Sequence, residues 1–232
     1  MQAATEPEPT DRRDRSEAIE DYAKAIYALE TRTSSPVATT KLAERLGVTP
    51  GSVSAMLKKL DERGLVVLEP YKGVRLTERG RAVALEVLRH HRLLELYLAT
   101  ELGVPWDRVH AEAEILEHVL SEELEERMAA KLGHPEHDPH GDPIPTRDLE
   151  LREDATLRLD ELPPGARGRF VRVSDSDPEM LRYLTAQSIA IGATFDVVEH
   201  QPFDGPIVVR FDEAQHALGR TLARAMRVVV LG

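Results

Sequence analysis

Residues 39–76 read TTKLAERLGVTPGSVSAMLKKLDERGLVVLEPYKGVRL, and the order of apolar residues and turns in this stretch decides the fold of its region. A short helix is predicted over residues 39–46 and ends at Gly47, which readily takes the left-handed conformation that closes many helices. A second helix is predicted over residues 52–63. Two short apolar runs then flank a loop that contains Gly73, as in a β-hairpin. Helix, turn, helix and hairpin in this order predict a winged helix-turn-helix.

The second of these helices would carry the residues that contact DNA. Hydroxyl groups at the start of such a helix can reach base edges or phosphates, and the helix N-terminus itself favours phosphate oxygens. Lysines farther along the helix and at the hairpin tip suit contacts to the DNA backbone. The predicted DNA-contacting residues are Thr49, Pro50, Ser52, Ser54, Lys58, Lys59, Tyr71 and Lys72. The alternative is a generic three-helix domain with lysines on its solvated face.

Composition divides the 232-residue chain into a tail and three domains. Residues 1–15 are rich in Glu, Pro, Asp and Arg, lack the apolar core of a signal peptide, and are predicted to be a disordered tail. The winged helix-turn-helix domain is predicted at residues 16–80, with a first helix that begins after Ser16.

Residues 81–152 are predicted to form a helical domain. Apolar periodicity predicts two long helices, residues 81–102 and 106–132, separated by a Gly-Val-Pro break. Residues 133–145 contain too many prolines and glycines for regular structure. A solvated acidic face is predicted for Glu122, Glu123, Glu125 and Glu126.

Residues 153–232 are predicted to form a small β domain. The predicted strands are residues 170–173, 195–198, 207–211 and 228–231, with a helix over residues 179–189. Short strands joined by turns are typical of a small barrel or sandwich. The chain is therefore predicted to be mainly α-helical with a small β domain.

The net charge of −11 argues at first against nucleic acid as a partner. However, residues 16–80 carry ten Lys and Arg against nine Asp and Glu, and phosphate binding needs only a local basic face. The chain has no cysteine, which excludes disulfides and thiolate ligands. No apolar stretch is long enough to span a membrane, and a cytoplasmic protein is the simplest expectation.

Histidines and acids with helical spacing lie in the middle of the chain. His110, Glu114 and His118 are four residues apart, so on a helix they would lie on one side, and Glu117 falls on the same arc. Nitrogen and oxygen donors held in this way are the ligands that a divalent cation needs. A lone histidine on a helix is usually a surface or core residue, so the predicted metal site rests on the whole set.

Five stretches resemble motifs of the diphtheria toxin repressor family, in the order in which that family has them. They are EDYAKAIY at residues 20–27, the helix of residues 52–64 with Leu65-Val66, RHHRLLE at residues 89–95, EILEH at residues 114–118 and PHGDPIP at residues 139–145. The resemblance covers nearly the whole chain after Ser16 and includes a C-terminal SH3-like domain of the FeoA type. It implies a metal-dependent transcriptional repressor that forms a homodimer and binds a palindromic operator in double-stranded DNA.

The resemblance also implies which residues bind the metal and which join the two subunits. The primary set is Asp21, Glu114, Glu117 and His118. The ancillary set is His91, Glu95 and His110. Some manganese-responsive relatives add ligands from the Pro-His-Gly loop and the SH3-like domain, and the matching residues here are His140, Asp138 and Asp177, or its neighbours Asp175 and Glu179. Dimer contacts are expected from Leu93, Leu96, Leu116 and Leu120, while Glu112 is expected to be dispensable.

The resemblance points to Mn(II) as the activating metal. Iron-sensing members carry Met and Cys where this chain has Asp21 and Glu114, and hard oxygen ligands suit manganese. Fe(II) is the alternative within the family, and Co(II) or Zn(II) can substitute in vitro because such sites generally bind them more tightly than Mn(II). Lys24 stands where compact manganese regulators have a glutamate, which argues against two closely spaced metals.

Two functions of other classes are open alternatives. A metallohydrolase could use Glu and His ligands around an open coordination position, although no Ser/His/Asp or phosphate-loop pattern is present. A metal-independent regulator could use its SH3-like domain to bind a protein partner.

Overall fold

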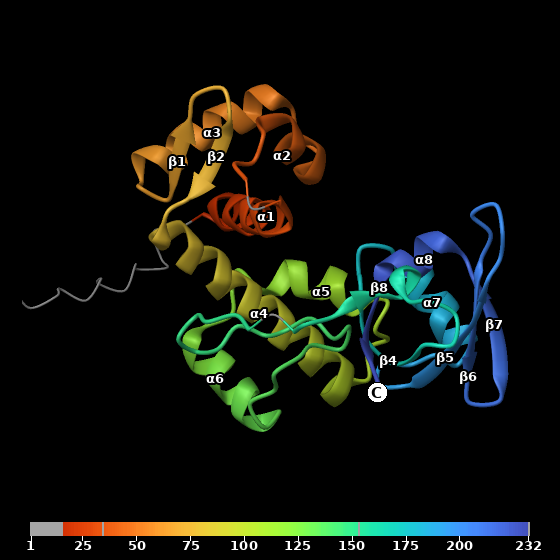
Figure 1. The fold of residues 1–232 in the computed structure, drawn as a ribbon. Coiled ribbons are helices and arrows are strands. Elements are labelled where there is room, and N and C mark those ends of the chain that lie inside the picture. The colour runs from red at the N-terminus through yellow and green to blue at the C-terminus, as the bar shows by residue number, and fades with distance from the viewer. Residues whose placement is uncertain (1–15, 34, 153, 232) are drawn as a thin grey trace, which may run out of the picture. The chain divides into compact units, whose positions relative to one another are not determined.

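The computed structural model describes residues 16–33, 35–152 and 154–231 (Figure 1). The tail predicted at residues 1–15 lies outside the described residues. Contacts divide the chain into two compact units, Met1–Leu88 and Arg89–Gly232. Each unit is described below by itself.

The first unit contains the predicted winged helix-turn-helix. Its helices are α1 (Glu17–Thr33), α2 (Thr39–Leu46) and α3 (Pro50–Glu62), and its antiparallel hairpin consists of β1 (Val66–Glu69) and β2 (Gly73–Leu76). Ile26, Leu42, Val53, Leu60 and Val74 are fully buried and form the centre of its core. The predicted architecture of this region is therefore confirmed.

Local chemistry explains where the first-unit helices begin and end. Gly47 closes α2 in the left-handed conformation, with a φ of 66°. Thr49 caps α3 because its side chain accepts a hydrogen bond from the Ser52 amide at 3.2 Å. Pro50 occupies the first turn of α3, where its missing N–H costs nothing, so the helix starts two residues earlier than predicted.

The helices of the second unit correct one prediction. The helix α4 (Glu78–Leu102) begins before the boundary between the units, and α5 (Val109–Leu116) and α6 (Glu122–Lys131) follow it. The single helix predicted over residues 106–132 is wrong, because the chain leaves the helix between α5 and α6. Ser121 starts a new helix there by accepting a hydrogen bond from the Leu124 amide at 3.3 Å, and acidic residues follow in the first turn.

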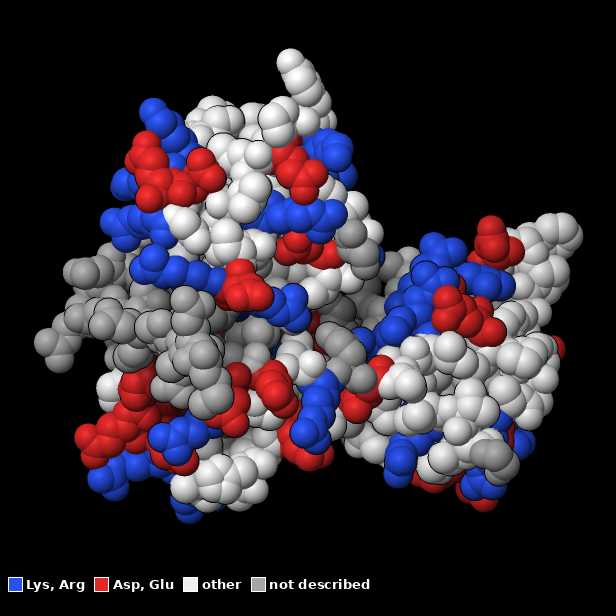
Figure 2. Space-filling view, turned by 60° about the vertical axis from the view of Figure 1, so that its left-hand side comes forward, with Lys and Arg blue, Asp and Glu red and all other residues white. Residues whose placement is uncertain are grey.

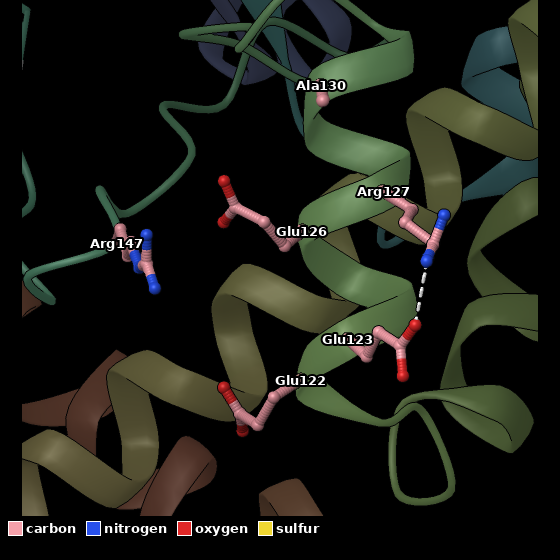
Figure 3. A pocket seen from close by; sticks show the side chains of 6 residues that line it. All are labelled: Glu122, Glu123, Glu126, Arg127, Ala130 and Arg147. Carbon is pink, nitrogen blue, oxygen red and sulfur yellow. Dashed lines mark hydrogen bonds and ion pairs between the residues drawn. The ribbon is translucent and has the colours of Figure 1, made fainter.

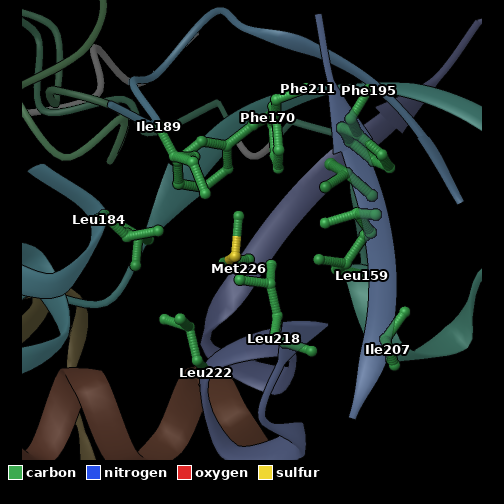
Figure 4. Packing of buried hydrophobic residues seen from close by; sticks show 14 of the residues in the cluster. Leu159, Phe170, Leu184, Ile189, Phe195, Ile207, Phe211, Leu218, Leu222 and Met226 are labelled. Carbon is green, nitrogen blue, oxygen red and sulfur yellow. The ribbon is translucent and has the colours of Figure 1, made fainter. Parts of the chain in front are cut away.

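The β domain is a six-stranded antiparallel sheet in the order β3-β8-β4-β5-β6-β7. Its elements are β3 (Leu157–Arg158), β4 (Arg167–Val173), α7 (Pro178–Ala186), β5 (Thr194–His200), β6 (Ile207–Phe211), β7 (Ala214–Leu218), α8 (Arg220–Ala225) and β8 (Met226–Val230). Side chains from α7 and α8, such as Leu184 and Leu222, pack with Phe170 and Met226 in one core (Figure 4). The four predicted strands are confirmed, while β3, β7 and α8 escaped prediction.

The irregular segment predicted over residues 133–145 packs against the β domain within the second unit. The carbonyl of His140 accepts a hydrogen bond from the Val173 amide of β4 at 2.9 Å. Gly141 has a φ of 84°, and a Cβ atom at this position would lie 1.9 Å from the Val171 carbonyl oxygen, so only glycine allows this approach. Among the described residues, no helix is both long and apolar enough to cross a membrane.

Candidate metal centre

Four side chains from three segments converge beside α4. His91 and Glu95 lie one turn apart on α4, and His91 Nε2 is 3.0 Å from Glu95 Oε1. His110 on α5 places Nδ1 3.2 Å from the same carboxylate oxygen and 3.0 Å from Asp175 Oδ2, which follows β4. One possible ligand atom from each of the four residues lies within 4.8 Å of the others, a spacing that suits one cation.

The second oxygen of Glu95 shows that these residues fit a cation. Glu95 Oε2 lies 3.8 Å from His140 Nδ1, and both atoms are buried without a hydrogen-bond partner among the described residues. Buried polar atoms of this kind are costly unless something compensates them. A cation between a carboxylate oxygen and an imidazole nitrogen would satisfy both atoms.

Asp138 shapes the loop that carries His140. Its buried carboxylate accepts hydrogen bonds from the amides of His140 at 2.8 Å and Asp142 at 2.9 Å. Burial, together with the charges of Asp142 and Glu95, raises the pKa of Asp138 well above its usual value. Asp138, Glu95 and His140 form a second group whose possible ligand atoms lie within 4.8 Å of one another.

Ionic interactions set the protonation of this cluster. Burial would raise the pKa of Glu95, but interactions with His110, His140 and His91 outweigh it and hold that pKa well below the usual value. Hydrogen bonds to Asp175 and Glu95 raise the pKa of His110 to about 10. Burial would lower the pKa of His140, but its interactions with Glu95 outweigh burial and raise that pKa to about 9. The metal-free cluster therefore binds protons at neutral pH that a cation would displace.

The predicted primary residues of the helical domain lie at the end of α5. Glu114 is on the helix, Glu117 is its C-terminal cap residue, and His118 lies in the following turn. His118 Nε2 is 3.6 Å from Glu117 Oε1. His91 Nδ1 lies 2.5 Å from Glu117 Oε2 and 3.6 Å from Glu114 Oε1, so His91 faces both predicted sets.

Of the other predicted ligands, one belongs to the first unit and one caps a helix of the β domain. Asp21 lies on α1 of the first unit, so its part in a primary site stays a prediction. Asp177 caps α7, since its side chain accepts a hydrogen bond from the Glu179 amide at 3.0 Å. Asp175, two residues earlier, is the acid that lies beside His110.

A buried network beside the predicted ligands was not expected from the sequence. Glu125 on α6 lies 2.5 Å from Arg89 Nε and 2.6 Å from His90 Nε2. His90 Nδ1 faces the Glu117 carbonyl at 3.3 Å, so the network supports the turn that carries Glu117. The prediction that Glu125 belongs to a solvated acidic face is wrong, because Glu125 is 5% exposed. Glu125 lies three and four residues before the buried Met128 and Ala129, so helical spacing to these apolar residues was the available signal.

The remaining acids of α6 match the prediction of a solvated face. Glu122 and Glu123 are exposed, Glu126 is half-buried, and all three line a shallow pocket with Arg127, Ala130 and Arg147 (Figure 3). In this view Glu122 and Glu126 point toward the side where Arg147 lies, while Glu123 pairs with Arg127 at 2.8 Å.

The predicted DNA-contacting residues all lie on the surface of the first unit. Every one of them, from Thr49 to Lys72, is exposed, and the Tyr71 side chain at the hairpin tip is completely so. Arg75 fixes the hairpin by pairing with Glu69 at 3.0 Å and with Glu30 of α1 at 3.1 Å. Basic and acidic side chains alternate over the face drawn in Figure 2, so no single sign of charge dominates it.

Comparison with known proteins identifies three matching family models. Residues 14–74 match the N-terminal DNA-binding domain of the iron-dependent repressors, and residues 77–146 match their metal-binding and dimerisation domain. Residues 157–230 match the FeoA domain. The resemblance seen in the sequence is therefore confirmed across nearly the whole described chain.

Individual relatives agree with the family models. The iron-dependent repressor IdeR of Mycobacterium tuberculosis is 39% identical over 158 residues, which cover 65% of this chain and 68% of the relative. The diphtheria toxin repressor of Corynebacterium efficiens is 32% identical over 226 residues, which cover 93% of this chain and 96% of the relative.

Solved structures of similar proteins match the fold over a similarly large part of the chain. A manganese-dependent transcriptional repressor in complex with manganese is 42% identical and has a TM-score of 0.85. The match covers 92% of this chain and 100% of that structure. ScaR with bound Zn²⁺ is 30% identical with a TM-score of 0.77, and the match covers 92% of this chain and 99% of that structure. The chain therefore belongs to the iron-dependent repressor family of metal-dependent transcriptional repressors.

Proposed function

We propose that Mn(II) is the cation that activates this metal-dependent repressor. The observation that carries the proposal is the pair of buried, unsatisfied donors, Glu95 Oε2 and His140 Nδ1, in a cluster made only of oxygen and nitrogen atoms. Hard oxygen donors favour Mn(II) over cations that select sulfur. The similar structure named as a manganese complex supports the same choice, and Fe(II) is the alternative.

We assign the cation to two centres. The ancillary centre consists of His91, Glu95, His110, His140 and Asp175, with Asp138 beside it. The primary centre consists of Glu114, Glu117 and His118 from the second unit and Asp21 from the first. A bound cation would supply positive charge that holds the clustered carboxylates together.

The protein's own residues would convert this charge into DNA binding. Glu117 and His118 come from the turn after α5, while Asp21 comes from the helix that begins the DNA-binding domain. Shared coordination would restrict the arrangements that the two units can take, and thereby increase the population of the DNA-binding one. Because the proposed partner is DNA, we place the action of this repressor in the cytoplasm.

The proposed complex is a homodimer on a palindromic operator, with one α3 helix for each half-site. Apolar residues on α5 and the following turn fit a subunit contact, because Ile115 is 70% exposed and Val119 is 72% exposed. Leu116 is also exposed. Leu93 and Leu120 are buried in the core of their own chain, so these two residues are removed from the expected dimer contacts. The family consists of transcriptional repressors, which sets the metallohydrolase aside.

Operator binding measured with Mn(II) and with EDTA tests the proposal. DNA selected by the protein in the presence of Mn(II) provides the operator. Wild-type protein should bind it at least about 100-fold more tightly with Mn(II), a coupling of about 2.7 kcal/mol. Glu117→Ala should abolish the difference, while Glu112→Ala, which changes an exposed acid on the same helix, should keep it. Equal affinity of the wild type in Mn(II) and EDTA would refute the metal switch.

A further inference from the structure

Trp106 connects the ancillary centre to the β domain through three different groups. Its carbonyl accepts a hydrogen bond from His140 Nε2 at 2.7 Å. Its indole ring lies nearly parallel to the His140 ring, with 6.0 Å between the ring centroids. Its indole N–H donates to Thr185 Oγ1 of α7 at 2.8 Å, and the ring packs against the core of the β domain.

The bond to the Trp106 carbonyl decides which nitrogen of His140 can bind a cation. A carbonyl oxygen only accepts, so Nε2 must carry a proton, and in the neutral ring the lone pair is left on Nδ1. This Nδ1 is the unsatisfied atom that faces Glu95 Oε2 at 3.8 Å. The Trp106 carbonyl therefore fixes the tautomer and ring orientation of His140, as hydrogen-bond acceptors of metal-binding histidines commonly do.

The other contacts of this region determine where Asp175 lies. Asp107, next to Trp106, pairs with Arg182 of α7 at 3.3 Å. Two residues before Asp175 in the chain, the Val173 amide donates to the His140 carbonyl at 2.9 Å. Asp175 lies between Val173 and Arg182 along the chain and pairs with His110 at 3.0 Å, so its position depends on how the β domain packs against the helical part.

We propose that Trp106 is a positioning residue that couples cation binding at the ancillary centre to packing of the β domain against the helical domain. The proposal rests on the ligand set assigned above, and it adds the contact between Trp106 and Thr185 as the coupling element. The same packing orients two donors, His140 Nδ1 and Asp175. Packing and cation binding must then strengthen each other by the same factor.

Thr185→Val in the full-length protein tests the coupling, because valine keeps the shape of threonine and removes the acceptor oxygen. Mn(II) affinity at the ancillary centre should fall about three- to tenfold, the range that a single hydrogen bond provides. Trp106→Phe, which keeps an aromatic ring and removes the N–H, should weaken Mn(II) binding to a similar extent. Thr221→Val, an exposed position on α8, is the matched control and should change nothing.

Fluorescence gives a measurement that needs no metal. Trp106 is the only tryptophan of the chain, so the emission reports the surroundings of this one indole ring. Emission of metal-free Thr185→Val should move to longer wavelength as the indole ring gains exposure to water. An unchanged spectrum would contradict the proposed role of the Thr185 contact.

A double-mutant cycle with His140→Ala separates this proposal from the assigned function. If the coupling passes through His140, Thr185→Val should weaken Mn(II) binding in the wild type and have no further effect in His140→Ala. An equal loss in both backgrounds would overturn the role of Trp106 while leaving the ligand set intact. Unchanged Mn(II) affinity of His140→Ala alone would overturn the ligand set as well.

Discussion

The two predicted ligand sets of the second unit differ in how the chain assembles them. Apart from Asp21, the primary set comes from one stretch, residues 114–118, whereas the ancillary centre draws on α4, α5, a loop and the β domain. A set from one stretch needs only the right local turn. A set from distant segments depends on their packing, so substitutions outside the ligands should affect it strongly. Four substitutions or conditions test this difference.

The largest effect is expected from Glu125→Ala. Removing this carboxylate leaves Arg89 and His90 buried without their anionic partner, which typically costs about 3–5 kcal/mol. The Glu117 turn, which His90 contacts, should lose order with it. Thermal unfolding of the metal-free protein measures the loss. Glu123→Ala, an exposed acid on the same helix, should unfold like the wild type, and equal stability of both variants would contradict the role of the network.

Glu95→Ala should separate the two centres. Glu95 contacts His91, His110 and His140, so its loss should weaken Mn(II) binding at the ancillary centre by at least about 100-fold, the upper end of the loss caused by removing a residue that only supports a ligand. The residues of 114–118 do not need Glu95, and their centre should keep its affinity. Calorimetric titration resolves the two centres. Simultaneous loss of both would show that the centres form one unit through His91.

The pH dependence should also be specific to the ancillary centre. Because the pKa of His110 is raised to about 10, this group stabilises the metal-free fold most below its unfolded pKa of about 6.5, and the contribution disappears as pH rises through about 10. Mn(II) must displace this proton and the proton of His140, whose pKa, despite burial, is raised to about 9 by interactions with Glu95, so Mn(II) affinity should rise with pH and rise most steeply below about pH 9. Titration in buffers with different ionisation enthalpies counts the released protons. His110→Asn should release fewer protons on Mn(II) binding than the wild type. An equal number of released protons would refute His110 as the origin of the pH dependence.

The smallest effect is expected in the DNA-binding unit, which serves as the reference for both centres. Lys58 is exposed on α3, and Lys58→Ala should weaken operator binding about three- to tenfold and lower the salt dependence by about one phosphate contact. Mn(II) affinity should stay unchanged. Altered Mn(II) binding in this variant would contradict the separation of the two functions.

Local signals explain which elements could be predicted. The helix α2 was predicted with its observed bounds because apolar spacing and Gly47 act within a few residues. The same logic failed between residues 106 and 132, where continuous apolar periodicity hid the Ser121 cap. Strand β7 escaped because its sequence, AQHAL, shows weak alternation, and its pairing with β6 decides its conformation.

By itself, the sequence determined the helix-turn-helix, the oxygen and nitrogen chemistry of the ligands and the family motifs. These properties depend on residue type and on neighbours along the chain. Only the tertiary structure decided that Asp175 rather than Asp177 faces His110, that His91 lies between both ligand sets, and that Glu125 is buried. Burial and ionic pairing depend on which distant segments pack together, and spacing along one helix carries no information about that packing.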